Sequence, residues 1–153
     1  MLLATSLVMF MTPGLAFFYG GLVGRKHVLT ITFQSFVSLG ITTMLWFAFG
    51  FSMCFSGTMN NGDHFGIIGN FDLMFLNGIN LCDPSPLNPG VPIYVFVAYQ
   101  MMFAIITPSL ITGAFANRVR FSAYVIFLVM WQILVYFPFV HMVWGGITCQ
   151  LGS

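Results

Sequence analysis

The chain carries very little charge. Its 153 residues include four Lys and Arg, three Asp and no Glu, so charged residues make up only 5%, whereas hydrophobic residues make up 59%. A soluble domain needs far more charge to cover its surface, which excludes that class. The composition instead predicts an integral membrane protein, and the net charge of +1 gives no reason to expect binding to nucleic acid.

Residues for redox, metal or acid–base chemistry are also scarce. Cys54, Cys82 and Cys149 match no metal-binding spacing, and an odd number leaves at least one of them unpaired within the chain. Asp63 and His64 are adjacent and could suggest a metal pair, but a solvated surface loop is the favoured interpretation. We therefore expect no enzymatic activity, no cofactor and no metal site.

Hydrophobic runs predict an all-α, polytopic protein with four membrane spans. The spans cover about residues 2–23, 28–55, 92–117 and 121–143, and each is long enough to cross a bilayer as a helix. The first run could instead be a signal peptide, but it lacks a basic start and continues through Phe17, Phe18 and Tyr19. Segment 56–91 is read as an ordered outer loop, which leaves residues 1–153 as one domain.

The few charges predict the orientation of the spans. All four basic residues lie in two short connections, Arg25 with Lys26 and Arg118 with Arg120. By the positive-inside rule both connections face the cytoplasm. The loop 56–91 contains no Lys or Arg and holds all three Asp, so it faces outside. Both termini are then expected outside the membrane.

Three prolines interrupt the spans. Pro13, Pro108 and Pro138 each lie inside a hydrophobic run. A proline frees a backbone carbonyl, which neighbouring helices, side chains or water must then satisfy. We therefore expect the spans to pack into a bundle rather than to stand apart in lipid.

The third span combines aromatic and neutral polar residues on one face. Spacings of four, three and four residues separate Phe96, Gln100, Phe103 and Thr107, which places them on one face of a helix. The spans contain no Asp, Glu, Lys or Arg, so a carboxylate-driven proton pump is disfavoured. The mixed face suits a narrow, partly dry pathway. The alternative is that Gln100 only hydrogen-bonds a neighbouring helix.

The fourth span ends in the sequence FPFVHMVWGG, residues 137–146. Trp144 could attract a small cation through a cation–π interaction, or it could be an interfacial anchor. His141 lies three residues earlier, at a helix end, where a structural role is more common than that of a ligand.

Three stretches resemble the ammonium transporters of the Amt/Mep branch of the Amt/Mep/Rh family. They are MTPGLAFFYGGLVGRKHVLTITFQS (11–35), GAFANRVRFSAYVIF (113–127) and YFPFVHMVWGG (136–146). The resemblance implies the first four spans of an eleven-span fold, with ammonium or ammonia as the substrate. It also implies a homotrimer in the plasma membrane with a pore through each subunit, and a cytoplasmic regulatory protein as a possible partner. An ammonium-sensing receptor on the same fold is the alternative.

The resemblance also implies roles for single residues. Phe103, in AYQMMFA, matches the outer of the phenylalanines that gate the pore, and Trp144 matches the tryptophan of the external recruitment site. Phe18 and Tyr19 match an aromatic pair of the first span, so Phe18, like Gln100 and Thr107, is a candidate pore-lining residue.

Two departures from the family pattern stand out. Asn117 occupies a position where many relatives have an acid. The chain also has no counterpart of the family's later aspartate, second gating phenylalanine, serine and two pore histidines. His27, His64 and His141 cannot replace those histidines, since they lie in a turn, in the outer loop and at the rim. We expect residues 1–153 to be the N-terminal part of a transporter.

The orientation can be tested by labelling. In a background with the three native cysteines replaced by Ser, cysteines introduced at Gly62 and at Lys26 should react with an impermeant thiol reagent from opposite sides of the membrane. The charge asymmetry places Gly62 outside and Lys26 inside. Labelling in intact cells and in inverted vesicles measures the side, and reaction of both positions from one side would contradict the four-span assignment.

Overall fold

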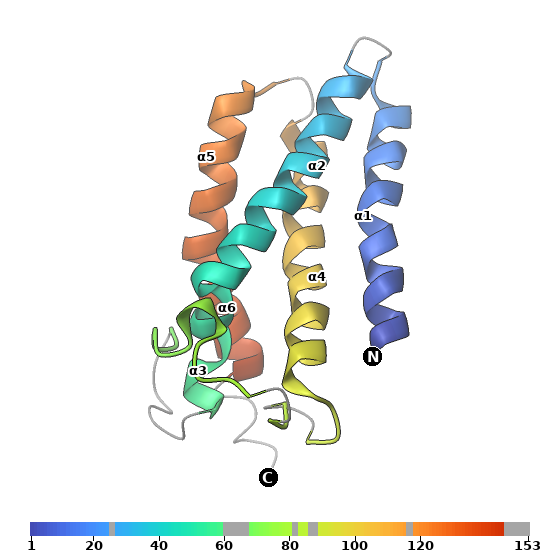
Figure 1. Ribbon diagram of the computed structural model, residues 1–153. Coiled ribbons are helices and arrows are strands. Elements are labelled where there is room, and N and C mark those ends of the chain that lie inside the picture. Colours follow the sequence, from blue (N-terminus) through green and yellow to red (C-terminus); the bar gives the residue numbers. More distant parts are fainter. Residues whose placement is uncertain (25–26, 60–67, 81–82, 86–88, 116–117, 146–153) are drawn as a thin grey trace.

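The computed structural model describes residues 1–24, 27–59, 68–80, 83–85, 89–115 and 118–145. Helices account for most of this part (Figure 1), and no strand occurs in it beyond an isolated bridge between Pro84 and Pro92. The sites that we singled out at Asp63, His64, Cys82, Asn117 and Cys149 lie outside the described residues.

The described helices follow one another in four long runs. They are α1 (Leu2–Leu22); α2 (Val28–Leu45) with the π-helical segment Trp46–Gly50 and α3 (Phe51–Met59); α4 (Ile93–Thr112) with the 3-10 turn Gly113–Phe115; and α5 (Phe121–Trp131) with the π-helical segments Gln132–Tyr136 and His141–Gly145 on either side of α6 (Phe137–Val140). A further 3-10 turn, Met74–Leu76, lies between the second run and the third.

Each of the four runs contains a stretch that is long and apolar enough to cross a membrane. They cover Leu2–Leu22, Val28–Ser56, Ile93–Thr112 and Phe121–Trp144. The all-helical, multi-pass architecture expected from composition is therefore confirmed. The third helix ends at Thr112, before the expected limit of 117, because the chain tightens into a 3-10 turn at Gly113.

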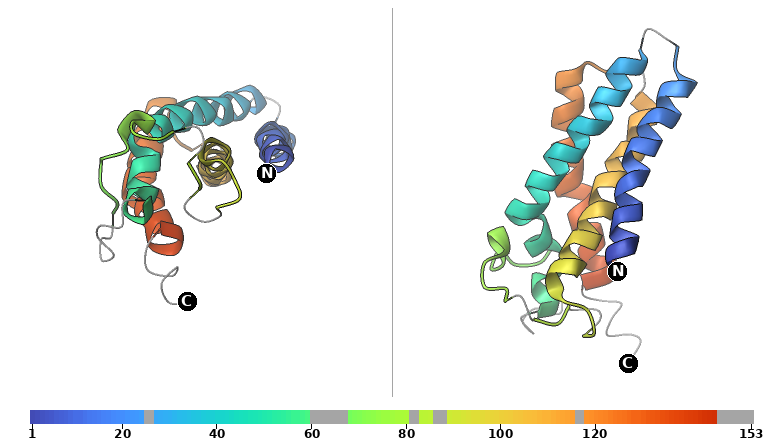
Figure 2. Two further views of the ribbon diagram at one scale, coloured as in Figure 1. Left: turned by 60° about the horizontal axis from the view of Figure 1, so that its bottom comes forward. Right: turned by 45° about the vertical axis from the view of Figure 1, so that its right-hand side comes forward.

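The four runs lie side by side, with α4 between α1 and the α5–α6 run. Figure 2 shows this arrangement, with α2 crossing the bundle along one side. The starts of α1 and α4 lie at one end of the bundle, and the ends of α1 and α4 lie at the other, near the starts of α2 and α5 (Figure 1).

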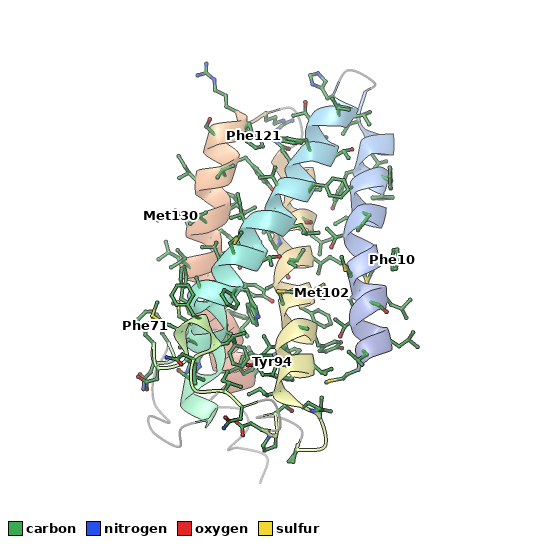
Figure 3. All side chains as sticks on the ribbon, viewed as in Figure 1. Phe10, Phe71, Tyr94, Met102, Phe121 and Met130 are labelled. Carbon is green, nitrogen blue, oxygen red and sulfur yellow. The ribbon has the colours of Figure 1, made fainter. Side chains whose placement is uncertain are left out.

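Small residues let α1 approach its neighbours. Its buried residues, Thr12, Ala16 and Gly20, recur every four residues and form a narrow strip. A Cβ atom at Gly20 would lie 3.2 Å from Cγ1 of Val28 on α2. Close backbone approach of this kind is what holds helices together where lipid is as apolar as the side chains. Most of the remaining residues of α1 are exposed, including Phe10 on the outer flank (Figure 3).

Polar side chains of the spans turn inward and bond one another. Ser38 of α2 and Ser109 of α4 are buried with their Oγ atoms 3.0 Å apart. Thr112 Oγ1 and the Tyr124 hydroxyl, on α4 and α5, are 3.1 Å apart. Since the bilayer core offers no water, these pairs join helices that would otherwise expose unsatisfied groups.

Aromatic rings fill the half of the bundle nearer to the start of α4. Ring centroids of Phe55 and Phe96 are 5.1 Å apart, and those of Trp46 and Phe137 are 6.2 Å apart. The rings are buried and meet edge-on or tilted, the geometry that aromatic pairs favour. This aromatic core joins α3, α4 and α6.

Tyr19 clamps α1 onto the end of α4. Its hydroxyl donates a hydrogen bond to the carbonyl oxygen of Leu110 at 3.1 Å, and its ring lies over Gly113. A Cβ atom at Gly113 would lie 2.6 Å from Cε1 of that ring, closer than side chains tolerate.

We expect Gly113→Ala to lower the free energy of unfolding by about 1–3 kcal/mol, because the ring of Tyr19 must move and lose its hydrogen bond. Thermal unfolding of the purified protein in detergent measures the effect. Gly40→Ala on α2 is the matched control, because nothing lies within 4 Å of its Cβ position. It should be neutral or slightly stabilising, and equal losses in the two variants would contradict the clamp.

Candidate functional site

The mixed face of α4 lies inside the bundle along part of its length. Phe96 and Gln100 are buried, with 2% and 4% of their surfaces exposed. Phe103 and Thr107, one and two turns further on, are half-buried. The structure therefore places all four residues on the side of α4 that the other helices partly cover.

Phe103 is held by two local contacts. Its ring meets that of Tyr99 edge-on, with the centroids 5.0 Å apart. Its backbone carbonyl accepts a hydrogen bond from Thr107 Oγ1 at 2.7 Å. Thr107, expected to line a pathway, thus uses its hydroxyl to bond the backbone of Phe103. Phe103 lies ten residues after the start of α4, about 15 Å along the helix axis.

Trp144 lies at the far end of the fourth span, in the π-helical segment His141–Gly145, and 40% of its surface is exposed. His141 is 2% exposed, and its Nδ1 lies 2.9 Å from the carbonyl oxygen of Cys54 on α3. The ring thus ties this segment to α3, in keeping with the structural role expected for His141.

Phe18 lies apart from the α4 face. It is 59% exposed on α1 and packs edge-on against Tyr19 at 5.6 Å. Of this aromatic pair it is Tyr19 that reaches α4, through Leu110 and Gly113.

Sequence reasoning missed Gln132, the first residue of the π-helical segment Gln132–Tyr136. It is fully buried, and its Nε2 donates to the carbonyl oxygen of Ala104 at 3.0 Å and to Thr42 Oγ1 at 3.3 Å. Its Oε1, like Nε1 of Trp46, is buried with no partner among the described residues. The sequence held one signal for this role, because Gln132 is the one Gln in the most apolar of the four spans.

The chemistry of this region is aromatic and neutral. Side chains of Phe, Tyr, Trp, Gln, Ser and Thr line the interior, and the described residues contain no cluster of three potential metal ligands. Such walls offer no fixed countercharge to an ion. They can attract a cation at a ring face and can accept a neutral molecule with a hydrogen-bonding group.

The comparisons agree on one family. All residues from 1 to 153 match the family model described as Ammonium Transporter Family. A relative from Methanothermobacter thermautotrophicus is 46% identical over 95% of this chain. Ammonium transporter 1 of Dictyostelium discoideum is 44% identical over 95% of this chain, and the ammonium transporter of Bacillus subtilis is 42% identical over 92%. This chain spans 35%, 30% and 33% of the lengths of these three relatives.

Solved structures share the arrangement of the helices. The crystal structure of Saccharomyces cerevisiae Mep2 matches with a TM-score of 0.80 at 30% identity, over 99% of this chain and 34% of that one. Candida albicans Mep2 matches with a TM-score of 0.79 at 30% identity, over 98% of this chain and 32% of that one. By sequence over its whole length and by the packing of its helices, the chain belongs to the ammonium transporter family.

Proposed function

We propose that the protein containing these residues moves ammonium or ammonia across the membrane through a hydrophobic pore with an aromatic outer site. The observation that carries this proposal is the uncharged, mixed aromatic and polar face of α4 inside the bundle of a chain that belongs to a transporter family. The chain spans about a third of the lengths of its relatives, and in this proposal its residues line part of the pore.

Trp144 and Phe103 have different roles in this proposal. Trp144 is exposed at the end of its span and collects ammonium at its ring face. Phe103, half-buried deeper in the bundle, acts as a gate. An ion entering hydrocarbon surroundings costs many kcal/mol, so ammonium transfers its proton to water at the outer end, the proton moves separately, and neutral ammonia passes the gate. Gln100, Thr107 and Phe18 are the proposed pore-lining residues.

The orientation and assembly are also proposals. The N-terminus lies outside, because the start of α1 lies at the opposite end of the bundle from the ends of α1 and α4, which the basic residues follow in the sequence (Figure 1). The protein would sit in the plasma membrane as a homotrimer, with a cytoplasmic regulatory protein as a partner, as the family resemblance implies. Relatives that are named transporters favour transport over the sensing alternative.

The recruitment role predicts a change in affinity. In a full-length transporter that contains this segment, Trp144→Leu should weaken the apparent affinity for ammonium by up to roughly tenfold, if ~1.4 kcal/mol of cation–π attraction is lost. Concentration dependence of methylammonium uptake measures it. Trp131→Leu, earlier in the same span, is the control and should leave affinity unchanged. If Trp144→Leu is expressed normally and its uptake depends on methylammonium concentration as in the wild type, Trp144 is only an interfacial anchor.

The gate role predicts a change in flux. Phe103→Leu removes a ring below the recruitment site, so maximal flux or leak should change by more than the apparent affinity does. Uptake into proteoliposomes separates the two quantities. Phe10→Leu provides a control, since Phe10 is 75% exposed on the outer flank of α1 (Figure 3). Equal, small effects of both substitutions would argue against a gate at Phe103.

A further inference from the structure

A proline leaves one specific carbonyl of α4 without its helical partner. In an α-helix each N–H bonds the carbonyl four residues earlier, and Pro108 has no N–H. The carbonyl that loses its partner is therefore that of Ala104. Ala104 is fully buried, so outside water cannot replace the missing donor. An unsatisfied carbonyl in the membrane interior costs several kcal/mol.

Gln132 supplies the missing donor from another span. Its Nε2 lies 3.0 Å from the carbonyl oxygen of Ala104, and the side chain is fully buried. The orientation of the amide follows from chemistry, because a carbonyl only accepts and must face the NH₂ group. A second bond to Thr42 Oγ1 at 3.3 Å fixes the amide between α2 and α4.

The local backbone brings Gln132 to this position. Gln132 begins a π-helical segment in which its own carbonyl accepts the N–H of Phe137, five residues later. A π-helical turn re-aims the side chains of a helix and occurs often at functional sites. Gln132 is thereby directed at the one residue of α4 whose carbonyl Pro108 has freed.

The bonded carbonyl adjoins the proposed gate. Ala104 follows Phe103 directly, and the Phe103 carbonyl is itself bonded by Thr107 Oγ1. The backbone carbonyls of the two consecutive residues Phe103 and Ala104 therefore both accept side-chain hydrogen bonds. A shift of α4 relative to the π-helical segment Gln132–Tyr136 that lengthens the bond from Gln132 to Ala104 would also move the backbone that carries the Phe103 ring.

We propose that Gln132 is a positioning residue for the gate: by bonding the Ala104 carbonyl that Pro108 frees, it fixes the backbone of α4 against the fourth span at this level and so sets the position of Phe103. This inference rests on the proposed function of Phe103. Gln132 acts through the backbone of α4 and does not itself contact the substrate.

The test is a double-mutant cycle in a full-length transporter that contains this segment. Gln132→Leu keeps the volume but removes the donor, so maximal methylammonium flux should fall about fivefold or more, with unchanged apparent affinity. Pro108→Ala gives α4 its own N–H for the Ala104 carbonyl. In that background Gln132→Leu should change flux by less than about twofold.

Thr42→Val is the matched control. It removes the weaker acceptor of Gln132 but leaves the bond to Ala104, so its flux should remain much closer to that of the wild type than the flux of Gln132→Leu does. An equal loss of flux from Gln132→Leu in both backgrounds would overturn the proposal, as would no loss in either.

Thermal unfolding is also measured for the four proteins of the cycle, which are the wild type, Gln132→Leu, Pro108→Ala and the double variant. This measurement depends neither on the expression level nor on the proposed transport function. Gln132→Leu should lower the unfolding temperature, or the folded yield, and Pro108→Ala should cancel that loss. Rescue of stability without any change in flux per folded protein would show packing alone and overturn positioning. If the wild type moves no methylammonium, the proposed function fails, whereas the stability cycle still decides whether Gln132 replaces the proline's missing donor.

Discussion

The structure depends on one constraint, which is that a polar group inside the bilayer must find its partner within the protein. The second, third and fourth runs largely obey it through side-chain bonds between helices, although Oε1 of Gln132 and Nε1 of Trp46 are buried without a partner among the described residues. Ser38 bonds Ser109, Thr112 bonds Tyr124, and Gln132 bonds the backbone of Ala104, in each case across two different helices. The polar residues are few, but because they pair between helices they determine how the helices are rotated against one another.

The interior has two regions with different chemistry, and α4 passes through both. Hydroxyl pairs join the helices near the end of α4, and aromatic rings fill the space nearer to its start. Phe103 lies between the two regions, next to the carbonyl freed by Pro108. A gate at this level would have a rigid aromatic core on one side and a bonded helix junction on the other. A shift of the backbone that carries the Phe103 ring would then involve the bond from Gln132 to the Ala104 carbonyl.

An interior of rings and neutral polar groups is consistent with a substrate that is charged in water and neutral in hydrocarbon. A fixed carboxylate would hold ammonium tightly and would itself be costly to bury. A ring face attracts the cation weakly, by roughly 0.5–2 kcal/mol, and releases it readily. In the pore that we propose, the exposed Trp144 would meet the cation in water, and the mostly buried face of α4 would meet the neutral molecule.

The membrane-protein class and the number of spans followed from the sequence alone, because insertion in lipid depends on local hydropathy and on the length of each hydrophobic run. The roles that we propose for Phe103 and Trp144 came from motif resemblance, and a structural role for His141 was expected from its place at a helix end. The sequence could not assign the roles of Gln132 and Tyr19. Helical periodicity shows which residues share a face, but not which neighbour that face meets, and adjacent residues such as Phe18 and Tyr19 point about 100° apart. The bond from Gln132 to Ala104 joins residues 28 positions apart and needs a π-helical turn in one helix and a proline in the other, so only the packed bundle decided it.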